Sequence, residues 1–67
     1  MAVARVTEIT ASSPKSIDGA IEEGLKRAAR TLRGITGLDV VSIKAKIDKG
    51  KILEYRVSLK ITFILED

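Results

Sequence analysis

Hydrophobic and polar residues alternate strictly through the end of the chain, Lys51–Asp67. From residue 53 the odd positions are large and apolar: Leu53, Tyr55, Val57, Leu59, Ile61, Phe63 and Leu65. The alternation predicts a half-buried β-strand, because successive side chains of a strand point to opposite faces. Such a strand would span roughly 55 Å at about 3.3 Å per residue, whereas a compact chain of this length has a radius of gyration near ~11 Å. We therefore expect either a sharp bend or a strand end that reaches a neighbouring subunit, and we favour the neighbour.

Two further segments have the character of strands. Ala2–Ala11 is rich in β-branched residues and predicts a first strand, with the weak alternation of an edge strand. Gly37–Asp48 alternates apolar and polar positions and predicts a second strand. The turn Asp48-Lys49-Gly50 places a glycine where a left-handed residue is needed, so the second and third strands form a hairpin.

Between the first two strands the apolar residues change to helical spacing, which predicts an amphipathic helix over Ile17–Arg33. One stripe of this helix is apolar or small: Ile17, Ala20, Ile21, Gly24, Leu25, Ala28 and Leu32. Ser16 is the expected N-cap, and Ser13 followed by Pro14 is the alternative. Gly34 is expected just past the last helical turn.

The predicted fold class is therefore α+β, with the order β-α-β-β. Placing the third strand between the other two makes every adjacent pair antiparallel, in the order 2-3-1. The helix then covers the face that holds the odd residues of the last strand. The opposite face is polar, and it is lined by Lys44, Lys46, Glu54, Arg56, Ser58, Lys60 and Thr62.

Composition limits what such a chain can do. The 67 residues make a single domain, 1–67, near the lower limit for a core that is stable without help. The chain has no cysteine and no histidine, which excludes disulfides and the usual zinc sites and leaves oligomerisation as the remaining stabiliser. Met1–Thr10 lacks the apolar run of a signal peptide or membrane span, so we expect a cytoplasmic protein.

The net charge of +3 comes from 12 basic and 9 acidic residues scattered along the chain. Nucleic-acid-binding modules cluster basic groups and interleave aromatic residues for stacking. The only aromatic residues here are Tyr55 and Phe63, both on the apolar face of the last strand. Neither a nucleic acid nor a membrane is therefore an expected partner.

No catalytic arrangement is visible: there is no nucleophile elbow, phosphate-binding loop or dinucleotide motif. The carboxylates do not have the spacing of a calcium loop, so no metal ligands are assigned. We expect a protein that is not an enzyme. Arg56, in the middle of the polar face, has two interpretations: an ion pair with Glu54 or a partner's carboxylate, or a role in holding an anionic or planar ligand.

From about Val6 to Asp67 the chain resembles the dodecins, a family of small β-α-β-β flavin-binding proteins that assemble as hollow twelve-subunit shells. The resemblance is carried by short stretches in the same order and without gaps: Glu8-Ile9, Ser12-Ser13, Ala20-Ile21, Ala28, Thr31-Leu32-Arg33, Val40, Gly50-Lys51-Ile52, Glu54-Tyr55 and Phe63-Ile64-Leu65-Glu66. It implies a homododecamer, which fits the long last strand and the small core.

The resemblance also implies a flavin, riboflavin or FMN, bound at subunit interfaces near Gly37, Ser42 and Arg56. In flavin-binding dodecins a tryptophan that opens the second strand stacks on the flavin ring, and Gly37 stands at that position. A glutamine after the tyrosine of the third strand contacts the ring, and here it is Arg56. An acidic residue handles the ribityl chain, and here it is Ser42. Because some dodecins have been assigned calcium, a flavin-free scaffold that binds calcium, another ion or a protein is the alternative.

Overall fold

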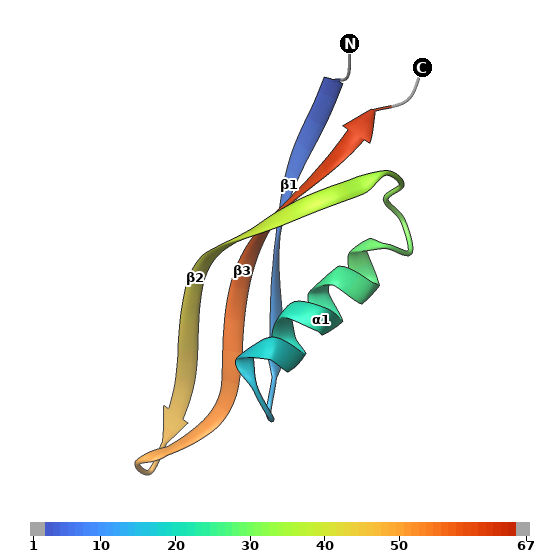
Figure 1. The fold of residues 1–67 in the computed structure, drawn as a ribbon. Coiled ribbons are helices and arrows are strands. Elements are labelled where there is room, and N and C mark those ends of the chain that lie inside the picture. Colours follow the sequence, from blue (N-terminus) through green and yellow to red (C-terminus); the bar gives the residue numbers. More distant parts are fainter. Residues whose placement is uncertain (1–2, 66–67) are drawn as a thin grey trace.

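A computed structural model describes residues 3–65, and it places three strands and one helix in the predicted order (Figure 1). Strand β1 covers Val3–Ser13, helix α1 covers Ile17–Ala28, strand β2 covers Ile35–Asp48 and strand β3 covers Lys51–Leu65. The sheet has the order β1-β3-β2, and both strand pairs are antiparallel. The predicted fold class and strand order are confirmed. The expected strand ends at Ala2, Glu66 and Asp67 lie outside the described residues.

The hairpin between β2 and β3 turns at Lys49 and Gly50, with Asp48 opposite Lys51. Both turn residues have positive φ, 50° for Lys49 and 76° for Gly50. Two left-handed residues in a two-residue loop match the twist of the flanking strands, which is why a glycine here favours a tight hairpin. The predicted turn is confirmed.

The first turn of α1 is capped as expected. Ser16 has an extended backbone, and its Oγ accepts a hydrogen bond of 2.9 Å from the backbone N–H of Gly19. Ser13 instead shapes the turn before the helix, because its Oγ accepts a bond of 3.1 Å from the N–H of Lys15. Of the two N-cap candidates, the structure selects Ser16.

The helix ends earlier than the sequence predicts, at Ala28 rather than Arg33. After Ala28 the N–H of Arg30 and the N–H of Thr31 bond to the carbonyls three residues before them, each at 3.2 Å. Bonds of this type tighten the chain at helix ends. Gly34 is therefore not the residue after the helix. Its positive φ of 73° turns the chain into β2.

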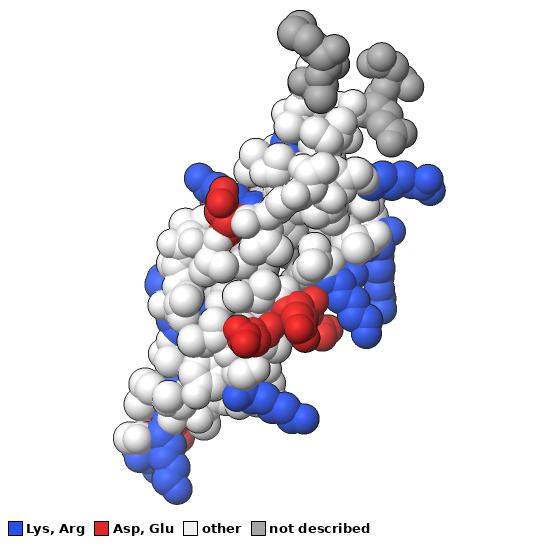
Figure 2. Space-filling model, in the orientation of Figure 1, with Lys and Arg blue, Asp and Glu red and all other residues white. Residues whose placement is uncertain are grey.

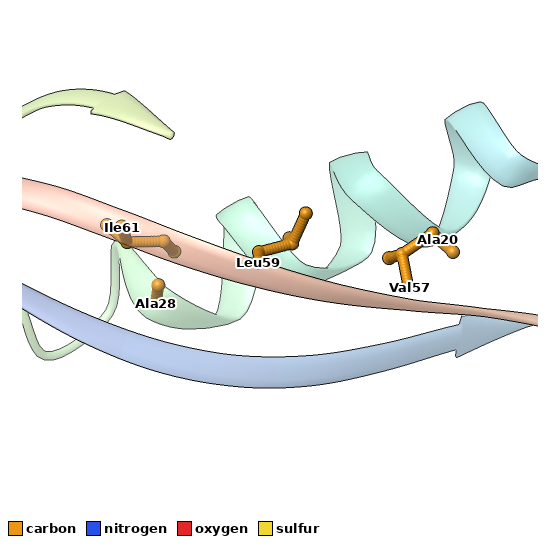
Figure 3. Packing of buried hydrophobic residues seen from close by; sticks show 5 residues of the cluster. All are labelled: Ala20, Ala28, Val57, Leu59 and Ile61. Atoms are coloured by element: carbon orange, nitrogen blue, oxygen red, sulfur yellow. The ribbon is translucent and has the colours of Figure 1, made fainter. Parts of the chain in front are cut away.

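The core lies between α1 and the middle of β3 (Figure 3). Val57, Leu59 and Ile61 of β3 are fully buried beneath Ala20 and Ala28 of α1. Gly24 lets the helix approach closely, since a Cβ on it would lie 3.0 Å from Cδ1 of Leu59. The predicted contact between the helix stripe and the odd residues of β3 is confirmed at its centre, whereas Leu25 of the stripe is exposed.

The molecule is far from spherical, with extents of 51 × 19 × 13 Å and a radius of gyration of 13.8 Å. A compact chain of this length has a radius near ~11 Å. The β2–β3 hairpin extends past α1 at one end, and the ends of β1 and β3 extend past it at the other (Figure 1). A sheet of this length is left uncovered at both ends by its own helix.

Candidate functional site

The candidate site lies on the sheet face opposite α1, which we call the polar face. The even residues of β3 from Glu54 to Thr62 point to this face, because the odd residues between them face the helix. The register places Lys46 opposite Glu54, Lys44 opposite Arg56 and Ser42 opposite Ser58. The predicted lining of this face is confirmed.

Arg56 forms an ion pair with Glu54, which lies two residues earlier on the same face. Its Nη2 donates to Oε2 of Glu54 at 2.8 Å, and its Nε donates to the same oxygen at 3.3 Å. Among residues 3–65 this is the one ion pair. The two side chains remain 49% and 28% exposed. A pair this exposed contributes only about 0–1 kcal/mol, so an incoming anion can compete with Glu54 for the guanidinium at little cost.

Of the three predicted ligand-binding residues, the structure brings two together. Ser42 and Arg56 are near neighbours, because Ser42 pairs with Ser58, Arg56 pairs with Lys44, and only the Ile43–Val57 pair lies between these two pairs. Gly37 pairs with Thr62, six residues from Arg56 along β3, which corresponds to about 20 Å. All three lie on the polar face, but one small ligand reaches Gly37 and Arg56 together only if they come from different subunits.

Sequence reasoning missed one member of this site, Lys44. It lies directly across from Arg56 on the neighbouring strand, so two cationic groups lie side by side at the next position on this face from Ser42. Like charges opposite each other on a sheet repel and destabilise the pair, which an anionic ligand would relieve. The strand alternation placed Lys44 on this face, and only the register, with its bulge between Val40 and Ser42, placed it beside Arg56.

The described part of one chain offers little on this face for binding a metal ion or stacking an aromatic ring. The described residues contain no group of three carboxylates, histidines or cysteines that could hold a metal ion. Tyr55 and Phe63 lie opposite Ala45 and Ile35 on the helix side of the sheet. A flavin ring on the polar face would therefore find no aromatic side chain from the described part of the same subunit to stack on.

A hollow that the sequence did not reveal lies between α1 and the outer edge of β1. We call it the α1–β1 groove; it has a volume of about 630 Å³. It is lined by Thr7, Ile9, Thr10, Ala11, Ser12, Glu23, Gly24, Arg27, Ala28, Thr31 and Leu32. The signal in the sequence is the run of small residues where α1 and β1 face each other, since they leave the space unfilled.

The surface also carries many large apolar side chains at 37–61% exposure: Val3, Val6, Leu25, Val40, Val41, Ile43, Ile47, Ile52, Leu53 and Leu65. Figure 2 shows the charged residues in separate groups, with broad uncharged areas between them. No helix within residues 3–65 is long and apolar enough to cross a membrane.

Comparison with known proteins identifies the family. The dodecin family model matches residues 3–66. The chain belongs to the dodecin family. A curated dodecin from Thermus thermophilus is 32% identical over 65 residues, which cover 97% of this chain and 94% of that protein. The resemblance inferred from the sequence is confirmed.

Solved dodecin structures agree with the fold described above. Dodecin from Streptomyces coelicolor superposes with a TM-score of 0.94 at 33% identity, covering 98% of this chain and 94% of that one. Calcium dodecin from Mycobacterium tuberculosis, a calcium-chelating antigen with a novel calcium-binding site, superposes with a TM-score of 0.83 at 31% identity. That match covers 96% of this chain and 91% of the other. This member of the dodecin family thus resembles both a dodecin named without a metal and one named for calcium.

Proposed function

We propose that this chain forms a non-catalytic, cytoplasmic homododecameric shell that binds a small ligand, FMN or riboflavin, at its subunit interfaces. The observation that carries the assembly is the surface that one chain leaves exposed. Its accessible surface is 5229 Å², whereas a compact monomer of this mass exposes about 4,200 Å². Oligomer formation would cover such surface, and membership of the dodecin family supports a shell as the form of the oligomer.

The polar face supports an anionic ligand more than a neutral one. Lys44, Arg56 and Lys46 follow Ser42 toward the hairpin on the same face, and Glu54 is the acidic group that the register places among them. A guanidinium binds phosphate through two parallel hydrogen bonds, and a lysine adds a point charge. We therefore propose FMN as the preferred flavin, with its phosphate at Arg56, Ser42 beside it and the ring near Gly37 of a neighbouring subunit.

The first test measures the mass and the absorption spectrum of the purified protein. We expect a mass twelve times that of the 7.3 kDa chain and a flavin absorption band after incubation with FMN. A stable monomer in dilute buffer would contradict the assembly. A twelve-subunit shell whose FMN fluorescence is not quenched on titration would retain the assembly and remove the flavin.

The second test separates the phosphate from the ring. Titrations with FMN and riboflavin are compared for the unmodified chain and for Arg56→Gln, with Lys60→Gln as the control on the same face. We expect FMN to bind more tightly, and Arg56→Gln to reduce that preference about tenfold or more while leaving riboflavin unchanged. Equal affinities of the unmodified chain for both flavins would contradict the role of Arg56.

A second candidate, a calcium-binding scaffold, is supported by the calcium-chelating relative at 31% identity. Since residues 3–65 of one chain offer no three-carboxylate cluster, such a site would combine carboxylates of several subunits. Calorimetric titration of the flavin-free assembly with calcium tests it. Saturable heat that Glu54→Gln or Asp39→Asn removes would support the scaffold, and no heat would exclude it.

A further inference from the structure

Two hollows in the surface of the subunit meet at the side chain of Arg27. One is the α1–β1 groove, with its volume of about 630 Å³. The other has a volume of about 90 Å³, and we call it the basic hollow; it is lined by Glu23, Lys26, Arg27 and Arg30. Because Glu23 and Arg27 line both, the groove and the basic hollow share one wall.

The floor of the α1–β1 groove is apolar. Gly24 and Ala28 of α1 are buried, whereas Ile9, Ala11 and Leu32 are only half-buried against the core. Sites for small molecules have volumes of about 300–1,000 Å³ and an apolar lining with a few polar groups at defined places. The groove has this size, and an apolar ligand in it would remove the remaining apolar surface of its floor from water.

Polar side chains form the wall of the groove on the helical side. Glu23 and Arg27 lie four residues apart, which places them one above the other on α1, and Thr31 follows four residues later. All three are exposed. A ligand lying in the groove would therefore have an apolar surface beneath it and Arg27 at the middle of its polar wall.

The basic side chains near the end of α1 are not neutralised by carboxylates. Glu23 and Arg27 have the spacing of a helical ion pair but do not form one, and the one ion pair among residues 3–65 lies instead on the polar face. Lys26 and Arg30 are also four residues apart, a spacing at which like charges repel. The basic hollow thus brings together three cationic side chains and one carboxylate, and an anion bound there would relieve the repulsion.

The helix dipole offers a simpler reason for part of this charge. Basic residues in the last turn of a helix complement its dipole, and Lys26 and Arg27 have that position. The dipole accounts for the cations, but it does not account for an apolar groove that shares Arg27 with them. The combination fits a ligand that has both an apolar and an anionic part.

We propose that the α1–β1 groove binds an amphipathic carboxylate, a small molecule with an apolar body and a single carboxylate group. The body lies over Ile9, Ala11 and Leu32, and the carboxylate lies at Arg27, beside the basic hollow. A guanidinium suits a carboxylate because it can donate two parallel hydrogen bonds to it. This site is separate from the proposed flavin site, since the groove lies on the helix side of the sheet and the flavin site lies on the polar face.

Calorimetric titration of the flavin-free protein with three probes tests the site. Octanoate carries both parts of the ligand, 1-octanol keeps the body without the charge, and acetate keeps the charge without the body. We expect one octanoate per chain, binding of 1-octanol that is weaker by about fivefold, and no binding of acetate in the same concentration range. Salt should reduce the preference for octanoate, because it screens the charge of Arg27.

Substitutions on the shared wall test which residue meets the carboxylate. Arg27→Gln should abolish the preference for octanoate over 1-octanol, and Arg27→Lys should keep part of it. Arg33→Gln is the matched control, because Arg33 lines neither hollow. Glu23→Gln should tighten the binding of octanoate, since it removes a like charge beside the ligand. All four positions changed are exposed or lie on the surface of the helical segment, so circular dichroism should show an unchanged fold.

Equal affinities of the unmodified protein for octanoate and 1-octanol would overturn the inference, and so would an unchanged preference in Arg27→Gln. Absence of octanoate binding would overturn it as well. Displacement of octanoate by FMN would place the carboxylate on the polar face and would also contradict the site in the groove. None of these results changes the titration of the protein with FMN alone, which tests the proposed function separately.

Discussion

Leu59 and Leu53 lie on the same strand, and the chain treats them very differently. Leu59 is fully buried beneath α1, whereas Leu53, near the hairpin, is 49% exposed. The reason is length: α1 has 12 residues and is about 18 Å long, whereas the molecule extends over 51 Å. One short helix can cover only the middle of so long a sheet. The covered middle holds the core of the subunit, and the uncovered ends leave large apolar side chains exposed.

The largest expected effect tests this comparison directly. Leu59→Ala removes a fully buried side chain and should lower the free energy of unfolding by about 2–5 kcal/mol. Leu53→Ala is the matched control, and in dissociated chains it should cost less than ~1 kcal/mol. Urea unfolding at several protein concentrations measures both. Equal losses at every dilution would show that the division into covered and bare parts is wrong.

The next effect concerns the close approach of α1 to β3. A Cβ on Gly24 would lie 3.0 Å from Cδ1 of Leu59 and 3.1 Å from Cβ of Ala11. Crowding of this kind costs about 1–3 kcal/mol, and the higher helix propensity of alanine returns about 1 kcal/mol. Gly24→Ala should therefore destabilise the subunit by up to ~2 kcal/mol in thermal or urea unfolding, whereas Glu22→Ala on the exposed helix face should change little. An increase in the stability of the Gly24→Ala variant would mean that α1 packs on the sheet less tightly than these distances indicate.

A smaller effect is expected where the covering helix begins. Ser16→Ala removes the oxygen that accepts the 2.9 Å bond from the N–H of Gly19. Loss of an N-cap costs about 1 kcal/mol, and Ser16→Thr should restore most of it. Urea unfolding measures the loss, with exposed Lys15→Ala as the control. No difference between Ser16→Ala and Lys15→Ala would contradict the capping role.

The smallest effect on stability is expected on the polar face. Glu54→Gln breaks the ion pair with Arg56, whose two side chains are 28% and 49% exposed, so unfolding should change by less than ~1 kcal/mol. The freed guanidinium should bind FMN more tightly, as measured by fluorescence titration. Riboflavin, which lacks the phosphate, is the control. Weaker FMN binding after Glu54→Gln would instead mean that Glu54 holds Arg56 in its binding position.

Sequence reasoning succeeded where one element's own pattern carries the information. The period-two alternation of the last strand, the helical spacing after Ser16 and the glycine at residue 50 each specify a local structure, and all are present. It failed at the helix C-terminus. There the N–H groups of Arg30 and Thr31 bond to carbonyls three residues earlier, and Gly34 turns the chain into β2 instead of following the helix. For the candidate site it placed Arg56 on the polar face but did not place Lys44 beside it, because neighbours across strands depend on register.

The sequence by itself determined the kind and order of the elements and the central position of β3, since these follow from side-chain periodicity and antiparallel pairing. Only the tertiary structure decided how far α1 covers the sheet, that Lys44 lies beside Arg56 and that a groove opens along β1. The physical reason is that bulges, helix length and the packing of small residues set distances between segments far apart in the chain. Those distances leave a single copy with more apolar surface than it can bury.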